Sequence, residues 1–184
     1  LGPNGAGKTT TIRLMLDLIR PTTGTVRIFG QECNSGPSTI RARIGYLPGE
    51  LSIYEGMTVR AVIDLFGSLR PGSIRKDWFG ELCARLDLRS EARVGELSTG
   101  NRQKVGIVLA LIAEPELLIL DEPRSGLDPL AQREVLRILR EIRDRGSTIF
   151  FSSHNLPEVE SICDRVAMIR RGELVAISQV DEIV

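Results

Sequence analysis

Leu1-Gly2-Pro3-Asn4-Gly5-Ala6-Gly7-Lys8-Thr9-Thr10 opens the sequence, and this stretch decides the fold. From its second to its ninth residue it fits G-x-x-x-x-G-K-[ST], a loop that wraps a phosphate group with backbone N–H groups. Glycines without a β-carbon let the backbone approach the anion, and the helix that follows directs its positive end at the same point. The pattern predicts that Lys8 reaches the β- and γ-phosphates of a nucleotide and that the Thr9 hydroxyl binds Mg²⁺. The alternative to a phosphate loop is a glycine-rich turn that only caps a helix. The Lys-Thr pair stands at the positions that the phosphate-loop motif requires, which argues against this alternative.

Composition is that of an ordinary globular chain. The 184 residues are 42% hydrophobic and 26% charged, enough for one domain with a core and an inserted subdomain. The 24 basic and 24 acidic side chains cancel, so no charge pattern favours nucleic acid or anionic lipid as a partner. Three cysteines without metal spacing indicate reduced thiols in a cytosolic protein. Since no apolar run could span a bilayer, a membrane role is expected to depend on a partner.

The start of the sequence predicts that residues 1–184 are a fragment. A phosphate loop connects a buried strand to a helix, yet only Leu1 precedes this loop, and there is no initiator Met. We therefore expect the domain to lack at least the strand that leads into the loop.

The rest of the sequence predicts alternating strands and helices. Strands are expected at 25–29, 44–47, 117–120 and 148–151, the last two of them buried, with a hairpin of 166–169 and 174–177. A first helix is expected from the phosphate loop to Pro21, and a short second one between the polar segment at 36–37 and residue 44. A third is expected over 58–69, ended by Pro71-Gly72, and a fourth over 74–86. Further helices are expected to begin at 98, to run from Pro129 to Gly146, and to run from 157 to 163. The fully apolar strand at 117–120 is typical of a parallel sheet buried on both faces. The predicted fold is an α/β phosphate-loop domain whose mostly parallel sheet is flanked by helices, with an inserted all-helical subdomain at about 56–113.

Two acids end the apolar strand. Ligands of parallel sheets bind at the carboxyl ends of the strands, where Asp121 can hold Mg²⁺ and Glu122 can orient or deprotonate an attacking water. The alternative is that these two acids have no catalytic role and only solvate the end of the strand.

Three further segments have two interpretations each. Ser98 and Gly100 begin a helix, which makes either a second anion site or only a cap. His154, the one histidine, follows a strand and by itself is as well explained by a structural or solvated role. The loop at 51–54 either packs on the core or is a docking surface for another chain.

Taken together, these segments resemble the ATP-binding subunit of an ABC (ATP-binding cassette) transporter over essentially the whole chain. The motifs stand in the family's order: Gly-Pro-Asn-Gly-Ala-Gly-Lys-Thr-Thr, Leu-Ser-Thr-Gly-Asn, Leu-Leu-Ile-Leu-Asp-Glu-Pro, Ser-Gly-Leu-Asp and His154. The resemblance implies an ATPase in which Lys8, Glu122 and His154 are catalytic and Thr9 and Asp121 bind Mg²⁺. The residues that it assigns to ATP are Gly2, Pro3, Asn4, Gly5, Ala6, Gly7, Lys8, Thr9, Thr10, Ser98, Gly100 and Asp128.

The resemblance also implies partners. Two subunits meet head to tail, so that Ser98 and Gly100 of one close over the ATP that the other holds at Lys8. The helical insertion and the loop at 48–57 face integral membrane permease subunits on the cytoplasmic side of the plasma membrane. Asn101-Arg102-Gln103-Lys104 and the upstream Gly-Tyr-Leu-Pro-Gly-Glu look most like bacterial export subunits. The transported substrate is chosen by subunits that this sequence does not contain.

Departures from the family pattern leave two other functions open. Gly49 stands at the position of the family's Q-loop glutamine, Thr99 and Asn101 alter the signature, and Arg124 replaces the usual Thr. Gly49 is the argument for a regulatory subunit that binds ATP without turning it over. A soluble ABC ATPase of translation or DNA maintenance is the third function, although the segment between Lys8 and Ser98 is too short for a coiled coil. The family's adenine-stacking aromatic lies upstream of the loop and outside this sequence.

Overall fold

The computed structural model describes residues 1–33, 39–69 and 74–182. These residues form two compact units, of which one comprises residues 1–41 and 151–184 and the other residues 42–150. The units are described separately below. Within the described ranges, no helix has both the length and the apolar composition that crossing a membrane requires.

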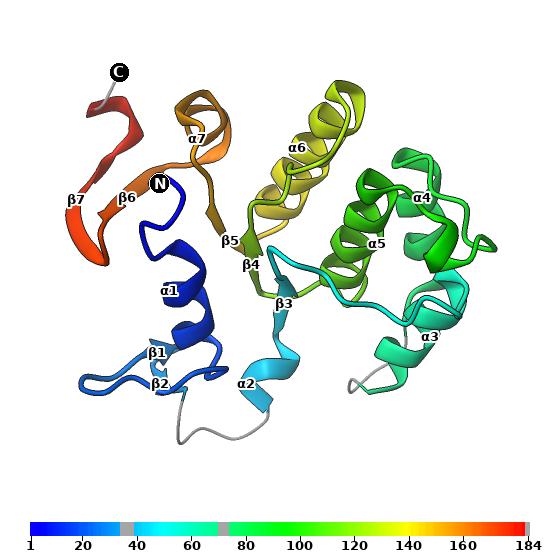
Figure 1. Cartoon of the computed structure of the whole chain (residues 1–184), viewed down its shortest axis with the longest axis horizontal. Coiled ribbons are helices and arrows are strands. Elements are labelled where there is room, and N and C mark those ends of the chain that lie inside the picture. Colours follow the sequence, from blue (N-terminus) through cyan, green and yellow to red (C-terminus); the bar gives the residue numbers. More distant parts are fainter. Residues whose placement is uncertain (34–38, 70–73, 183–184) are drawn as a thin grey trace. The chain divides into compact units, whose positions relative to one another are not determined.

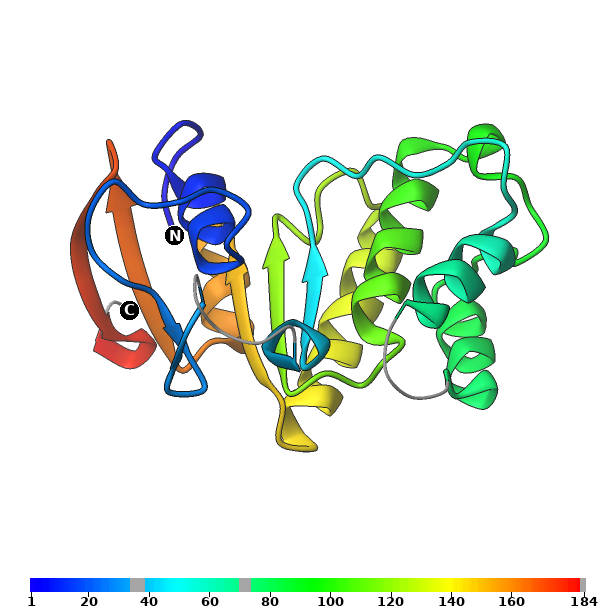
Figure 2. The same ribbon diagram turned by 90° about the horizontal axis from the view of Figure 1, so that it is seen from below.

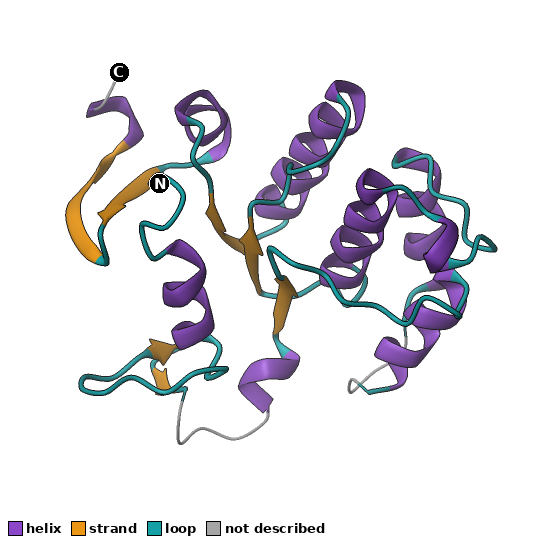
Figure 3. Ribbon diagram, viewed as in Figure 1, coloured by secondary structure: helices purple, strands orange, loops and turns teal. Residues whose placement is uncertain are grey.

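Helices and short strands are mixed along the chain, and three α-helices follow one another between residues 59 and 111 (Figures 1 and 3). The α-helices are α1 (Lys8–Met15), α2 (Thr39–Ala42), α3 (Val59–Ser68), α4 (Lys76–Arg85), α5 (Thr99–Leu111), α6 (Pro129–Asp144) and α7 (Leu156–Ile162). The strands are β1 (Arg27–Ile28), β2 (Gln31–Glu32), β3 (Ile44–Leu47), β4 (Leu117–Asp121), β5 (Thr148–Ser152), β6 (Arg165–Arg170) and β7 (Glu173–Gln179). Two 3-10 turns lie at η1 (Val94–Glu96) and η2 (Val180–Glu182).

A parallel pair of strands is the centre of the 42–150 unit. Strands β3 and β4 run side by side, as Figure 2 shows, and in their parallel register Ile44 is opposite Leu117 and Leu47 is opposite Leu120. Every residue of β4 is buried, which explains why residues 117–120 are continuously apolar rather than alternating. The sheet has the order β3-β4-β5, and the boundary between the two units falls within β5. The predicted α/β class with a parallel sheet is confirmed.

Helix α5 packs closely on β3 because glycines line the contact. A β-carbon on Gly45 of β3 would lie 2.1 Å from the Ala110 carbonyl oxygen of α5. A β-carbon on Gly106 of α5 would lie 2.6 Å from the side chain of Leu47 and 2.7 Å from that of Leu51. Neither glycine can accept a side chain without moving its neighbour, so these two residues fix how near the helix comes to the sheet.

Local signals placed the helices of this unit correctly. The Thr58 hydroxyl accepts the Ala61 amide and begins α3, and the Asp128 carboxylate accepts the amides of Leu130 and Ala131 at the start of α6. The inward face of α6 is formed by Val135, Ile138, Leu139 and Ile142, which recur at helical spacing.

Three predicted elements differ from the structure. Helix α1 ends at Met15 rather than continuing to Pro21, because Asp17 adopts a left-handed φ of 55° and the Leu18 amide turns back to the Arg13 carbonyl. The strand predicted at 25–29 is reduced to β1, which pairs only with β2. Strand β5 is not fully buried, since it is an edge of its sheet. The predicted breaks at 36–37 and 71–72 lie outside the described residues.

In the other unit, the β6–β7 hairpin forms as predicted, with Val166 opposite Ser178 and Ala167 opposite Ile177. Buried Val159, Val166 and Val180 form a small core beside it.

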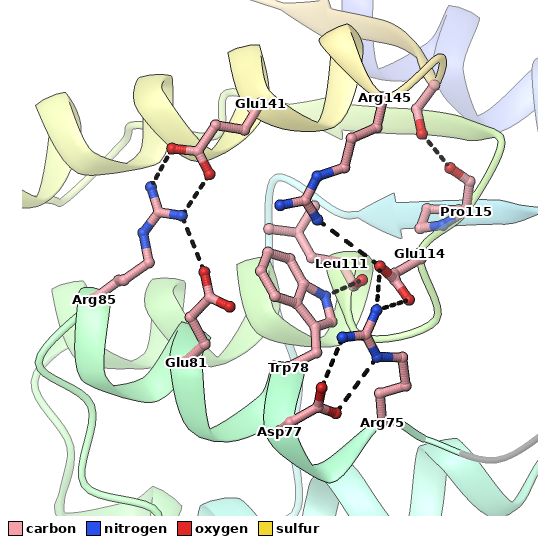
Figure 4. Close-up of polar contacts among 11 residues, drawn as sticks. Arg75, Asp77, Trp78, Glu81, Arg85, Leu111, Glu114, Pro115, Glu141 and Arg145 are labelled. Atoms are coloured by element: carbon pink, nitrogen blue, oxygen red, sulfur yellow. Dashed lines mark hydrogen bonds and ion pairs between the residues drawn. The ribbon is translucent and has the colours of Figure 1, made fainter.

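Ion pairs join α4 to α6 (Figure 4). The Arg85 guanidinium donates to Glu141 at 2.6 and 2.8 Å and to Glu134 at 2.6 Å, and also lies 3.4 Å from Glu81. The side chains of Arg85 and Glu134 are both only 19% exposed. This arrangement raises the pKa of Arg85 and lowers that of Glu141, because hydrogen bonds between the two favour both charged forms.

A second group holds the opposite end of the two helices. The Trp78 indole N–H donates to the Leu111 carbonyl at 3.2 Å, and the Arg145 guanidinium lies 5.4 Å from the Trp78 ring centre. Glu114 accepts from Arg75 at 3.2 Å (Figure 4). Both groups connect the helical stretch of this unit to α6.

Arg85→Met is expected to lower the free energy of unfolding by about 1–2 kcal/mol, since two half-buried carboxylates lose their cation. This loss of stability should become smaller as the pH falls. The pKa of Glu141 is lower in the folded than in the unfolded protein, so the ion pair stabilises the fold at pH values above the unfolded pKa and no longer does so once the carboxylate is protonated. Urea unfolding at several pH values measures both effects. Arg137→Met is the matched control, because Arg137 pairs with the same Glu134 but is 70% exposed, and it should change stability by less than about 0.5 kcal/mol. Equal losses in the two variants would contradict the role of burial.

Candidate nucleotide-binding site

The phosphate loop has the backbone that an anion site needs. Gly5 and Gly7 adopt positive φ values of 77° and 106°, a region that side chains disfavour. Gly7 precedes α1 and, having no side chain, cannot itself cap the amides of that helix end. The first turn of α1 therefore presents its N–H groups and the positive end of the helix dipole to a ligand.

Lys8 and the β6–β7 hairpin brace this loop. Lys8 Nζ donates to the Gly2 carbonyl at 2.7 Å and to the Pro3 carbonyl at 3.2 Å, so its charge lies over the loop. The Gly172 amide donates to the Ala6 carbonyl at 2.8 Å. A β-carbon on Gly2 would lie 2.4 Å from the carbonyl oxygen of Ile169, which explains a glycine here without any ligand.

His154 lies near the start of the loop in the same unit. It follows β5, and the Gly2 amide donates to the carbonyl of the preceding Ser153 at 3.2 Å. His154, Gly2 and Pro3 line one cavity of about 420 Å³. The structure thus brings the predicted histidine and the predicted loop together within one unit.

The two acids occupy the end of β4 in the other unit. Asp121 is 1% exposed and is the last residue of the strand. Glu122 has a φ of 51°, a left-handed conformation that is uncommon for a residue with a side chain. Such a backbone is stable only when its surroundings hold it, and outliers of this kind gather at functional sites.

Gly49 lies directly against Asp121. A β-carbon at position 49 would be 3.0 Å from the Asp121 Oδ2 atom. The side chain of a glutamine at position 49 would therefore contact the carboxylate from its first carbon onward. Glycine places no side chain over that carboxylate. Glu50 lines a separate apolar cavity.

Ser98, Gly100 and Asp128 occupy helix starts in this same unit. The Ser98 hydroxyl accepts the Asn101 amide at 3.3 Å and begins α5. Asp128 begins α6, and amide hydrogen bonds from Ala131 and Leu130 lower the pKa of its carboxyl. A β-carbon on Gly100 would lie 2.7 Å from the Gly126 carbonyl oxygen, so the start of α5 abuts the turn that leads to α6.

Two glutamines at this turn were missed by the sequence analysis. Gln132 donates to the Leu127 carbonyl at 3.0 Å and accepts from Arg124 at 2.7 Å. Gln103, on α5, donates to the carbonyls of Glu122 and Pro123. The sequence did contain a signal for Gln103, which stands five residues after Ser98 on the helix that begins with the signature motif.

An apolar cavity of about 420 Å³ opens beside the loop that follows β3. Its lining comes from that loop and from α3 and α5, and includes Leu51, Ile53, Phe66, Leu109 and Ile112. The loop at 51–54 therefore contacts the core through some of its residues, while Tyr54 remains 65% exposed.

Comparison with known proteins agrees with this geometry. The family model described as "ABC transporter" matches residues 1–125. The bacitracin transport ATP-binding protein of Bacillus licheniformis is 41% identical over 95% of this chain, which covers 58% of that protein. The Nod factor export ATP-binding protein of Paraburkholderia xenovorans is 35% identical over 96% of this chain, which covers 59% of that protein.

A solved structure of an ATP-binding subunit of an ABC transporter superposes with a TM-score of 0.89 at 33% identity, covering all of this chain and 78% of that one. The chain spans a little more than half the length of the relatives that it matches. On the matched family model and these identities, the chain belongs to the ABC transporter family, among its ATP-binding proteins, as the motif order predicted.

Proposed function

We propose that this protein binds and hydrolyses MgATP, dimerises head to tail around the nucleotide, and drives substrate movement through membrane permease partners. The observation that carries this proposal is the phosphate loop: two left-handed glycines, a helix that begins directly after the second of them, and a lysine folded over the loop. These three features supply amides, dipole and positive charge at one point, as a triphosphate requires.

The residues fit the groups that they are proposed to hold. Lys8 exchanges its carbonyl partners for the β- and γ-phosphates. Thr9 and Asp121 offer a hydroxyl and a carboxylate, the hard oxygen ligands that Mg²⁺ prefers alongside phosphate oxygens. The bound metal ion neutralises charge that develops on the phosphates.

Glu122 is proposed as the group that orients or deprotonates the attacking water. His154 is proposed to contact the γ-phosphate. Because little covalent chemistry is required of the protein in phosphoryl transfer, positioning of these groups is the main catalytic contribution.

Dimerisation is proposed to complete each site. The start of α5 combines the Ser98 hydroxyl with the free amides of a helix end, a second anion site. Facing the partner's nucleotide, it would offer hydrogen-bond donors to the γ-phosphate. Asp128 is proposed to lie at the same interface, at the start of α6.

Membrane partners are proposed to dock on the apolar cavity lined by Leu51, Ile53 and Phe66. Exposed Tyr54 and Leu65 extend this surface, and such a patch favours a protein partner. We propose that residues from about 56 to 113 form the helical subdomain, which contributes Phe66, Leu109 and Ile112 to this surface. Similarity to a Nod factor export protein supports export as the direction and the cytoplasmic side of the plasma membrane as the location.

Ser98→Glu tests the head-to-tail arrangement. A carboxylate placed against the partner's γ-phosphate should abolish the dimer that MgATP induces, observed by gel filtration, because like charges repel in a closed site. Nucleotide affinity of the monomer, measured by calorimetry, should stay within about twofold, since Lys8 is untouched. Ser68→Glu, on an exposed residue at the end of α3, should leave the dimer intact. A Ser98→Glu protein that still dimerises with MgATP would exclude the arrangement.

A further inference from the structure

The turn that carries Glu122 is held by a side chain from another helix. Gln103, on α5, is only 9% exposed. Its Nε2 atom lies 3.4 Å from the Glu122 carbonyl oxygen and 3.3 Å from the Pro123 carbonyl oxygen. One amide group therefore spans two successive carbonyls of the backbone that positions the catalytic candidate.

This backbone needs support. Glu122 is in the left-handed region at a φ of 51°, and the proline that follows it contributes no N–H group. The Ser125 amide also donates to the Glu122 carbonyl, at 3.0 Å. A left-handed backbone is strained for a residue with a β-carbon, so hydrogen bonds to its carbonyl stabilise a conformation that would otherwise relax.

The same helix contacts the turn a second time. At its first turn, α5 approaches Gly126 so closely that a β-carbon on Gly100 would lie 2.7 Å from the Gly126 carbonyl oxygen. Because α5 contacts both ends of the 122–126 segment, a movement of α5 changes the orientation of Glu122.

From these contacts we infer that Gln103 is a positioning residue for Glu122, joining the signature end of α5 to the catalytic carboxylate of the same chain. The inference rests on the proposed function, in which Ser98 closes on the partner's ATP while Glu122 acts on the chain's own ATP. One buried amide thus makes the geometry of each site depend on the occupancy of the other.

Gln103→Met keeps the length of the side chain and removes the donor. In steady-state ATP hydrolysis by the purified protein, kcat should fall about tenfold while KM stays within about twofold, because Glu122 is misplaced and nucleotide binding is intact. Val108→Ala, in the same helix and 0% exposed, is the control for lost stability. When its melting temperature falls as far as that of Gln103→Met, Val108→Ala should keep kcat within about twofold of the parental value. Parental kcat in Gln103→Met, or the same loss of kcat in Val108→Ala, would overturn the inference.

Gln103→Glu provides a second readout that packing alone would not move. When protonated, the new carboxyl has an O–H donor in place of the amide, and burial raises the pKa of such a group. The ratio of its kcat to that of Gln103→Met should therefore rise several-fold as the pH falls from about 8 to about 6. A ratio that is constant with pH would overturn the inference.

Glu122→Gln in the same assay separates the two levels of the argument. If that variant hydrolyses ATP at the parental rate, the proposed function fails at its catalytic residue. If it is inactive while Gln103→Met is parental, the proposed function stands and only the role of Gln103 fails.

Discussion

Glu122→Gln is expected to lower kcat for ATP hydrolysis by about 10²–10⁴-fold, the range that a positioned general base contributes. Glutamine has nearly the same shape but cannot accept a proton from the attacking water. The left-handed backbone and its bonds from Ser125 and Gln103 do not involve the side chain, so the fold should not change. Single-turnover hydrolysis of radiolabelled ATP measures the effect.

A second result should accompany the loss of turnover. With hydrolysis blocked, the ATP-bound dimer has no route to reopen, so MgATP should convert Glu122→Gln to a dimer that is stable in gel filtration, and EDTA should reverse it. Glu173→Gln, on an exposed acid of β7, is the control and should behave as the parent does. Parental turnover in Glu122→Gln would disprove the assignment of Glu122, and a persistent monomer with bound ATP would disprove the dimer.

Lys8→Ala is expected to weaken MgATP binding by roughly 10–100-fold, because a charge-assisted hydrogen bond to phosphate contributes about 1.5–3 kcal/mol. The lysine already lies over the loop through the carbonyls of Gly2 and Pro3, so little conformational freedom remains to be lost on binding. Isothermal titration calorimetry with a non-hydrolysable analogue measures the change.

Lys76→Ala is the matched control for this experiment, since Lys76 begins α4, away from the phosphate loop in sequence. Its affinity should equal that of the parent. The Lys8→Ala protein should also keep its far-UV circular dichroism, because the loop is braced by backbone contacts such as that between Gly172 and Ala6. Unchanged affinity in a folded Lys8→Ala protein would mean that the phosphate loop is not the nucleotide site.

Much of the fold was predictable because its determinants are local. The apolar run that became β4, the caps Thr58 and Asp128, and the inward stripe of α6 are all readable within a few residues of sequence. The end of α1 was not, since the apolar spacing continues past Met15 while Asp17 turns the backbone left-handed. Hydrophobic spacing indicates which residues can share a face, but not where the chain leaves the helix.

The sequence by itself determined the family and pointed to the residues that we propose to contact the nucleotide, because a phosphate loop and a helix start exert their chemistry through consecutive residues. Only the tertiary structure revealed the groups that hold those residues in place: the Ile169 carbonyl against Gly2, Gly49 against Asp121, and Gln103 beneath Glu122. Each of these contacts joins segments that are far apart along the chain. They depend on how closely two backbones approach, a distance that packing decides and that no local pattern of residues encodes.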